Sequence, residues 1–178
     1  MIRKATTQDI DAVERSYTEL LQHEQTHGAY TVWQSGIYPT RQTAKQGLAE
    51  GALYVAEQDG ELCASMIMNQ IQPEEYHQIK WQEPAAPDQV LVIHLLCVRP
   101  SKAGRGIGKE MVQFAIEEGK RLHCSAIRLD TGPQNKPAVA LYQKLGFEIA
   151  ATGTMAVGGL ISHNDHLFFE KRITASVK

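Results

Sequence analysis

The spacing of apolar residues predicts two helices near the start of the chain. Apolar positions recur at helical intervals after Thr7, which we take as the helix cap, and continue to about Gln25. A second, shorter helix is expected to open at Pro39-Thr40 and to end at Gly51, because glycine commonly follows the last turn of a helix. Residues 2–5 come before both helices and fit a short edge strand.

Strand-like patterns fill the middle of the chain. Residues 52–58 and 61–71 predict a hairpin, and Asp59-Gly60 between them favours a two-residue turn. Residues 72–87 combine prolines with many polar side chains, so we expect an exposed excursion there. Residues 89–98 are almost wholly apolar, which is typical of a central strand buried on both faces.

The second half of the chain alternates strands with helices. A glycine-rich turn at residues 98–108 leads into a helix with one apolar face, formed by Ile107, Met111, Phe114, Ala115 and Leu122. The elements that follow are a strand at 126–131, a helix at 137–145 closed by Gly146, and strands at 147–157 and 166–173 joined through Gly158-Gly159. The order β-α-α-β-β-β-α-β-α-β-β predicts an α/β protein with one mixed sheet and helices on both faces.

Composition narrows the class of protein. The 178 residues fit a single domain over 1–178, and 43% hydrophobic with 21% charged residues is ordinary for a folded chain. A net charge of −2 does not favour binding to nucleic acid or to an anionic membrane. No apolar run reaches the ~20 residues that would span a bilayer. The N-terminus lacks the apolar stretch of a signal peptide. Three unpaired cysteines in apolar surroundings indicate reduced thiols and a cytoplasmic location.

The glycine-rich turn has the chemistry of an anion site. Gly104, Gly106 and Gly108 permit close approach to the backbone, and a helix start offers free N–H groups with partial positive charge. Lys102, Arg105 and Lys109 add positive charge around the turn. A phosphate group therefore suits this turn.

The spacing excludes two common nucleotide loops. A dinucleotide fingerprint requires G-x-G-x-x-G, but Lys109 stands where its last glycine belongs. A Walker A loop requires a first glycine where Ala103 stands, and a serine or threonine where Glu110 stands. From the turn alone, an ordinary strand-to-helix connection stays an equal alternative.

A second segment resolves the ambiguity. Residues 135–147 combine an asparagine, an alanine, a Leu-Tyr pair and a Gly-Phe pair in the pattern N-x-x-A-x-x-L-Y-x-x-x-G-F, carried by Asn135, Ala138, Leu141, Tyr142, Gly146 and Phe147. Together with the glycine turn, this pattern resembles the GCN5-related N-acetyltransferase (GNAT) superfamily. The resemblance is sharp over residues 91–148. One departure is Ala103, which stands where the family signature [QR]-x-x-G-x-[GA] begins with Gln or Arg.

The resemblance implies a fold, an activity and a cofactor. It implies a central mixed sheet of about seven strands flanked by about four helices, with strands that splay at the cofactor cleft. It implies transfer of an acetyl group from acetyl-CoA to an amine. The positions implied to bind acetyl-CoA or coenzyme A are Leu96, Cys97, Val98, Lys102, Ala103, Gly104, Arg105, Gly106, Ile107, Gly108, Lys109, Asn135, Ala138 and Tyr142. Backbone N–H groups, with Lys102 or Arg105, would replace the signature side chain that Ala103 lacks.

Two residues are candidates for proton transfer. Tyr142 matches the family's usual general acid, and a phenol is neutral at pH 7 with a proton to give. His94 is the candidate base, because its ordinary pKa near 6.5 suits proton removal and strict alternation would place it on one face with Leu96. The alternatives are a buried core histidine and a chain of waters.

Cys97 and the histidine pair near the end of the chain are interpreted as structural residues. Alternation would point Cys97 away from His94, so a covalent acetyl-cysteine is disfavoured. The pair His163 and His166 with Asp165 reads as a solvated turn, and no metal site is expected.

The acceptor is expected to be a small-molecule amine. Trp33, Tyr38 and Trp81 are large rings that could line its pocket, and packing against the sheet is the alternative for each. Trp81 would also be the point where the polar excursion packs. A protein or peptide amine, and a non-catalytic acyl-CoA-binding module, stay open as alternative functions. The sequence is compatible with a homodimer.

Overall fold

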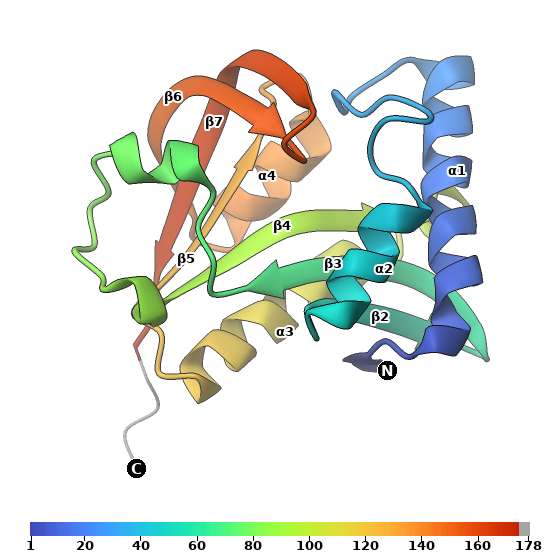
Figure 1. The fold of residues 1–178 in the computed structure, drawn as a ribbon, viewed down its shortest axis with the longest axis horizontal. Coiled ribbons are helices and arrows are strands. Elements are labelled where there is room, and N and C mark those ends of the chain that lie inside the picture. The colour runs from blue at the N-terminus through green and yellow to red at the C-terminus, as the bar shows by residue number, and fades with distance from the viewer. Residues whose placement is uncertain (175–178) are drawn as a thin grey trace.

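A computed structural model describes residues 1–174, in which seven strands form one mixed sheet. The order across the sheet is β1-β2-β3-β4-β5-β7-β6 (Figure 1). The strands are β1 (Ile2–Lys4), β2 (Leu53–Gln58), β3 (Glu61–Asn69), β4 (Val90–Val98), β5 (Ala126–Thr131), β6 (Glu148–Val157) and β7 (Ile161–Arg172). The helices are α1 (Ile10–His27), α2 (Arg41–Ala49), α3 (Ile107–Arg121) and α4 (Lys136–Lys144), joined by short 3-10 turns that include η1 (Thr7–Asp9), η2 (Glu74–Gln78) and η4 (Pro100–Lys102). The predicted element order and fold class are confirmed.

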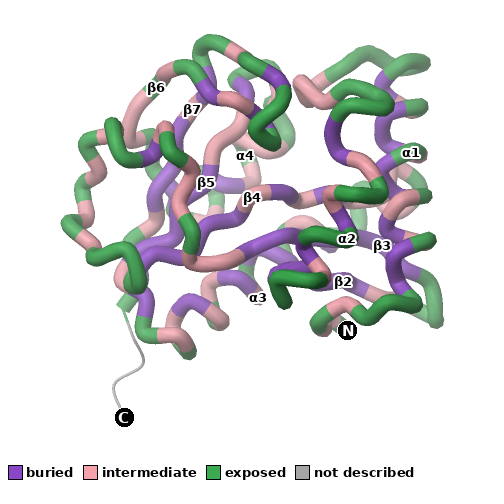
Figure 2. The backbone as a smooth tube through the Cα atoms, in the orientation of Figure 1, coloured by how far each residue is buried: buried purple, intermediate pink, exposed green. Residues whose placement is uncertain are grey.

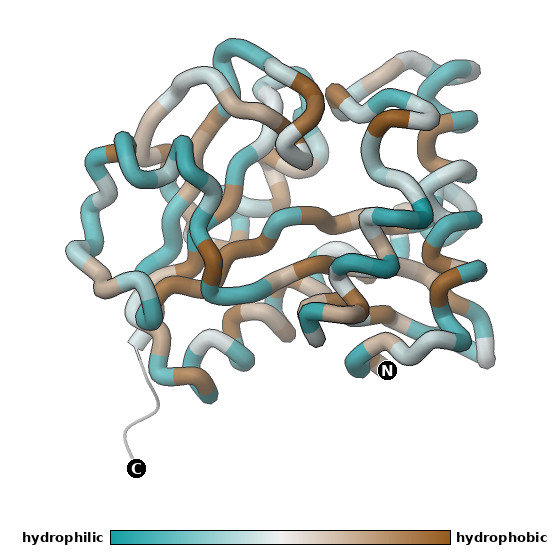
Figure 3. Tube along the Cα trace, viewed as in Figure 1, coloured by the Kyte–Doolittle hydropathy of each residue, from teal (hydrophilic) through white to brown (hydrophobic). Residues whose placement is uncertain are grey.

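Two apolar layers hold the sheet between helix pairs. One layer joins α1 and α2 to one face, and the other joins α3 and α4 to the opposite face (Figure 1). The central strands are buried along most of their length (Figure 2) and are rich in apolar residues (Figure 3). Burial on both faces explains why residues 89–98 lack a polar alternation. Within residues 1–174, no helix is both long and apolar enough to cross a membrane.

Two predicted boundaries are wrong. The first helical segment is capped by Thr6 instead of Thr7, because the Thr6 backbone N–H donates to the Asp9 carboxylate at 2.7 Å. The last strand begins at Ile161 instead of residue 166. Residues 161–163 pair with the end of β6, and a tight turn at Gly158-Gly159 joins the two strands. His163 and His166 therefore lie in a strand, and the prediction of a solvated turn is wrong.

The polar excursion at residues 72–87 is anchored to the sheet more firmly than its composition indicates. Arg128 of β5 and Glu170 of β7 form a buried ion pair at 2.9 Å, and Glu170 also accepts the backbone N–H groups of residues 82 and 83. The Arg128 guanidinium lies 4.4 Å from the centre of the Trp81 ring. Tyr76 of η2 is only 1% exposed. The packing point at Trp81 is confirmed, and Tyr76 is a second one that the sequence did not indicate.

A β-bulge interrupts β4 at His94. In the pairing with β3, Ile67 faces Leu95 and Met68 faces Ile93, so His94 has no partner in the register. The alternation of faces breaks at this point, because Ile93 and Leu96 contact the same core layer although they are three residues apart. The argument that placed His94 on the face of Leu96 by strict alternation is therefore wrong.

The parallel strands β4 and β5 separate halfway along their length. They pair from Val90 with Ala126 to Ile93 with Leu129, and no further. Beyond this point β4 continues to pair only with β3, and β5 only with β7. A strand edge is thus left open inside the fold, at the carboxyl ends of two parallel strands, where α/β sheets bind ligands.

Candidate active site

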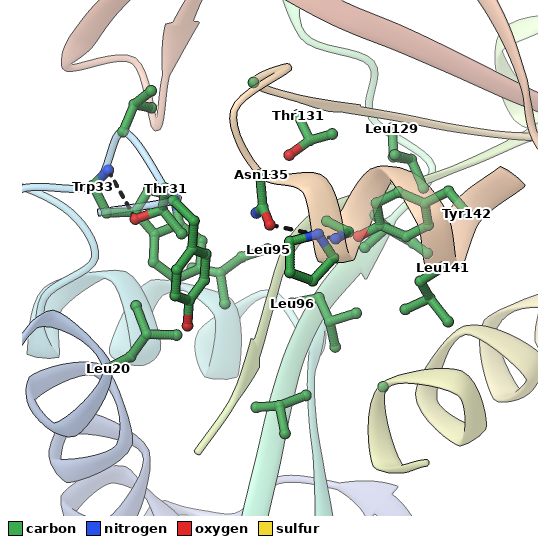
Figure 4. A pocket seen from close by; sticks show the side chains of 18 of the residues that line it. Leu20, Thr31, Trp33, Leu95, Leu96, Leu129, Thr131, Asn135, Leu141 and Tyr142 are labelled. Atoms are coloured by element: carbon green, nitrogen blue, oxygen red, sulfur yellow. Dashed lines mark hydrogen bonds between the residues drawn. The ribbon is translucent and has the colours of Figure 1, made fainter. Parts of the chain in front are cut away.

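A cavity of about 460 Å³ occupies the gap between the separated ends of β4 and β5. One wall comes from α1 and the loop after it, represented by Leu20, Thr31 and Trp33 (Figure 4). The opposite wall comes from α4, with Asn135 and Tyr142, and Leu95 and Leu96 of β4 lie between the two walls. The cavity therefore joins the two faces of the sheet through the splay.

The open edge of β4 lines the middle of the cavity. Leu96 and Val98 contribute to the lining, whereas Cys97 does not. The Cys97 side chain is fully buried on the other side of the strand, with Sγ 3.8 Å from the Ser16 carbonyl oxygen of α1. Burial raises the pKa of this thiol to about 12. Cys97 is therefore a packed, protonated thiol whose side chain lies outside the cavity.

The turn before α3 presents a row of free backbone donors. Gly104 and Gly106 both have φ of 76°, a left-handed conformation that favours glycine. No backbone N–H from Gly104 to Lys109 donates a hydrogen bond within residues 1–174. Gly106 is the N-cap of α3 and supplies no capping side chain, so the positive end of this 15-residue helix stays open to an anion. The geometry fits the pyrophosphate of coenzyme A.

The positive side chains around this turn differ in their partners. Lys102 forms an ion pair with Glu61, so its charge is already matched. Arg105 and Lys109 make no ion pair within the part of the chain that the structure describes. Ala103 and Gly108 line the cavity, whereas the side chain of Ile107 is buried under the helix. Of the two candidates for replacing the signature side chain, Arg105 is the one with a free charge.

Helix α4 brings three of the predicted residues to the cavity. Asn135 caps the helix by accepting the Ala138 backbone N–H at 3.3 Å, and both residues line the cavity (Figure 4). Tyr142 lies against Phe147 and Phe169, with ring centres 5.7 and 5.8 Å apart. Burial, together with the negative charge of Asp130, raises the pKa of Tyr142, so its phenol keeps its proton at neutral pH.

His94 lines the cavity, but its imidazole is engaged elsewhere. Its Nε2 lies 2.6 Å from Oδ1 of Asn69 in β3, which places the ring proton on Nε2 when that oxygen accepts. Burial lowers the pKa of His94 to about 4, against the opposing effects of Glu50 and the Ile71 backbone. The ring is therefore neutral at pH 7 and is a weak base.

The three predicted acceptor-side rings separate into two groups. Trp33 lines the cavity. Tyr38 is buried beneath the β6–β7 turn, where a Cβ on Gly158 would come within 2.3 Å of its ring, and Trp81 packs on Tyr76 and Arg128. Neither of these two rings lines the cavity, so both are packing residues in this structure.

Sequence reasoning missed a carboxylate at the centre of the site. Asp130 lies in β5 just beyond the last pair of this strand with β4, and it lines the cavity together with His166 of β7. Its Oδ1 accepts the Tyr76 hydroxyl at 2.5 Å, and its Oδ2 lies 3.5 Å from Nε2 of His166. A polar residue that follows an apolar strand parallel to its neighbour was the available signal. No group of three or more His, Cys, Asp or Glu within residues 1–174 is arranged to hold a metal ion.

Comparison with known families agrees with the two sequence motifs. A family model described as the Acetyltransferase (GNAT) family matches residues 12–147, which is most of the chain. The chain therefore belongs to the acetyltransferase (GNAT) family, a family of acyltransferase enzymes that use acetyl-CoA. The family resemblance drawn from the glycine turn and residues 135–147 is confirmed.

Individual relatives match parts of the chain. N-alpha-acetyltransferase 30 of Saccharomyces cerevisiae is 40% identical over 55 residues, which is 31% of each chain. Mycothiol acetyltransferase of Corynebacterium jeikeium is 29% identical over 79 residues, 44% of this chain and 23% of that protein. The chain thus spans less than a third of either relative. The solved structure of yncA from Salmonella typhimurium with its cofactor acetyl-CoA superposes with a TM-score of 0.68 at 17% identity. The match covers 100% of this chain and 96% of that one and shows the same fold.

Proposed function

We propose that this protein transfers an acetyl group from acetyl-CoA to the primary amine of a small molecule, by direct attack within a ternary complex. One observation carries the proposal: a single cavity joins the open amide turn before α3, the splayed edge of β4 and Tyr142 to a separate wall on the other face of the sheet. Two substrates can therefore meet at the splay from opposite faces.

The cofactor half would be held mainly by backbone groups. The free N–H groups of residues 104–109 would bind the pyrophosphate, with Arg105 close by. The unpaired edge of β4 at Leu96 and Val98 would pair with the extended arm of the cofactor, much as a missing strand would. A backbone N–H near Val98 would stabilise negative charge on the thioester oxygen. Acetyl-CoA supplies the activated acyl group when bound.

Tyr142 would donate the proton that the departing thiolate needs. Its phenol lines the cavity, and its raised pKa keeps it protonated at neutral pH, so a proton is available at the site. Direct attack is favoured over a covalent intermediate, because the only cysteine on β4 points into the core beside Ser16. His94 stays the sequence-based candidate for the base, weakened by its contact with Asn69.

The acceptor wall supports a small molecule over a peptide. The ring of Tyr38 packs directly against Gly158, so the loop after α1 and the tip of the β6–β7 hairpin touch. Trp33 and Val157 from these two segments both line the cavity. An extended peptide needs an open groove between such segments, whereas a small amine fits a closed pocket. The buried free thiols of Cys63, Cys97 and Cys124 fit a cytoplasmic location.

Thioester consumption with a panel of amines tests the proposal. We expect turnover with at least one small primary amine and a mass gain of one acetyl group on that amine. Acetyl-CoA binding by calorimetry is measured in parallel. Saturable binding without turnover of any amine or peptide would favour the acyl-CoA-binding module, and acetylation of peptides alone would favour the protein-amine alternative.

A further inference from the structure

Two buried carboxylates on adjacent strands have opposite surroundings. Glu170 of β7 is paired with Arg128 at 2.9 Å and accepts two backbone N–H groups. Asp130 of β5 has no Lys or Arg partner within residues 1–174, although its side chain is only 14% exposed. A buried carboxylate without a cation is costly unless something binds it, and this one faces the cavity.

The surroundings of Asp130 favour its protonated form. Burial raises its pKa to about 6, although the hydrogen bond from the Tyr76 hydroxyl opposes the shift. The titratable groups that bear on it are Tyr76 and Glu75 of η2, Tyr38 of the loop before α2, Tyr142 of α4 and His166 of β7. None of these groups is a cation at pH 7, because burial lowers the pKa of His166 to about 4.

A pair of histidines orients the second oxygen of Asp130. Nε2 of His166 lies 3.5 Å from Oδ2 of Asp130, and because a carboxylate can only accept, an N–H donor at this nitrogen requires the hydrogen on Nε2. Nδ1 of His166 then accepts, and Nδ1 of His163 at 2.8 Å must be its donor. His163 therefore fixes the tautomer of His166, which in turn aims a donor at Asp130.

We propose that Asp130 is the group that binds the ammonium of the acceptor and accepts its first proton, with His166 as a positioning residue fixed by His163. The inference rests on the proposed acetyl transfer and adds the acceptor site to it. Asp130 has one oxygen hydrogen-bonded to the Tyr76 hydroxyl and the other 3.5 Å from Nε2 of His166, and it lines the cavity, so it keeps lone pairs for a further, cationic donor.

The protons balance without a further reagent. The ammonium gives one proton to Asp130, and the neutral amine attacks the thioester carbon. The carbon–sulfur bond breaks as the carbon–nitrogen bond forms, and the sulfur leaves as thiolate. Tyr142 gives that thiolate its proton and regains one from the nitrogen. Asp130 returns the first proton to water when the products leave, so one proton is released for each acetyl group transferred.

The same wall defines the class of acceptor. Within residues 1–174, no Lys or Arg lines the cavity, so the lining offers no lysine or arginine cation to a carboxylate on the acceptor. Leu20, Trp33 and Val157 give the acceptor side an apolar surface. The site therefore suits a primary amine with an apolar body and no carboxylate, and disfavours a free amino acid.

The pH dependence of kcat/KM tests the role of Asp130. With 2-phenylethylamine as the probe, the wild-type value should rise with pH through an apparent pKa near 6, because only ionised Asp130 binds the ammonium. Asp130→Asn should lower kcat/KM at pH 7 by about 100-fold or more and remove this rise, with acetyl-CoA affinity kept. Asp59→Asn, in the β2–β3 turn, is the matched control and should behave as wild type. The assignment would be overturned if kcat/KM of Asp130→Asn still rose with pH near 6. It would also be overturned if that rise disappeared in His94→Asn and not in Asp130→Asn.

Substitutions at His166 separate positioning from folding. His166→Leu removes the donor to Asp130 and should move the rise in kcat/KM to higher pH, whereas His166→Gln keeps an N–H and should restore it. Identical pH profiles of kcat/KM for His166→Leu and His166→Gln would contradict the positioning role of His166.

A matched pair of acceptors tests the substrate class. Phenylalanine differs from 2-phenylethylamine only by its carboxylate, and its kcat/KM should be lower by at least about 100-fold. Equal kcat/KM values for the two compounds, or no acetylation of either, would overturn the proposed acceptor class. Calorimetry of 2-phenylethylamine binding adds a readout that needs no turnover: binding by wild type and its loss in Asp130→Asn would support the site even if acetyl transfer failed. If Asp130→Asn acetylated other amines as fast as wild type, the role of Asp130 would be rejected while the proposed acetyl transfer would stand.

Discussion

The two halves of the cavity are built from different materials. The proposed cofactor half consists of backbone: open N–H groups at residues 104–109 and the unpaired edge of β4. The proposed acceptor half depends on side chains: Asp130 from β5 and His166 from β7 line the cavity, and Tyr76 from η2 donates to Asp130 from behind. The first half comes from one continuous strand–turn–helix, and the second from three segments that are far apart in the sequence.

This difference determines which substitutions disrupt each half of the site. A backbone site depends on dihedral angles, so it is sensitive to the loss of a glycine and tolerant of side-chain change. A side-chain site depends on charge and burial, so one isosteric change removes its chemistry while the fold survives. Substitutions with matched controls can therefore break one half at a time.

The largest effect is expected where the halves meet, at Tyr142. Tyr142→Phe removes the proton for the thiolate and should lower kcat by about 100-fold or more. The affinity for acetyl-CoA should stay within about twofold, because backbone groups provide the binding. Tyr17→Phe removes another buried hydroxyl, which has no hydrogen-bond partner within residues 1–174 and lies outside the cavity, and should leave kcat unchanged. An undiminished kcat in Tyr142→Phe would remove the general-acid role.

A large effect on stability is expected in the acceptor half, at Asp130. Its folded pKa of about 6 exceeds the unfolded value of 3.8, so the folded state binds the proton more tightly. Stability is therefore higher below pH 4 and is lost as the pH rises to about 6. Asp130→Asn does not titrate, so its free energy of unfolding relative to wild type should increase by about 1–3 kcal/mol between pH 4 and pH 7. Denaturant unfolding at the two pH values measures this difference, and a constant difference would show that Asp130 has an ordinary pKa in the folded state.

An intermediate effect is expected in the cofactor half, at Gly106. Gly106→Ala and Gly159→Ala are matched, because both sites have left-handed φ angles (76° and 73°) and open space around the added Cβ. Each should cost about 1 kcal/mol of stability. Only Gly106→Ala should weaken acetyl-CoA binding, by about tenfold, as the turn shifts its N–H groups. Equal affinity of the two variants in calorimetry would reject residues 104–109 as the pyrophosphate site.

The smallest effect distinguishes two charges beside the same turn. Arg105→Gln removes a charge without an ion-pair partner in the described chain and should weaken acetyl-CoA binding by up to about fivefold at low salt. Lys102→Gln should change it less, because Glu61 already matches the Lys102 charge. Added salt should reduce the Arg105 effect. A larger loss in Lys102→Gln would mean that the ion pair with Glu61 opens when the cofactor binds.

Much of the fold was readable from local patterns. The hairpin at Asp59-Gly60, the strand at 126–131 and the helix before Gly146 follow from spacing and turn residues, because these features act over a few residues. The misplaced start of β7 has a different cause. The polar residues 162–165 read as a turn, and only pairing with β6 makes this segment a strand.

The candidate site divides in the same way. The sequence by itself determined the glycine turn, the capped α4 with Tyr142 and the family, because each is encoded in one short segment. Only the tertiary structure decided the bulge that redirects His94, the end of pairing between β4 and β5, and the meeting of Asp130 with Tyr76 and His166. Such contacts depend on the register of strands and the docking of a distant loop, and no local pattern specifies them.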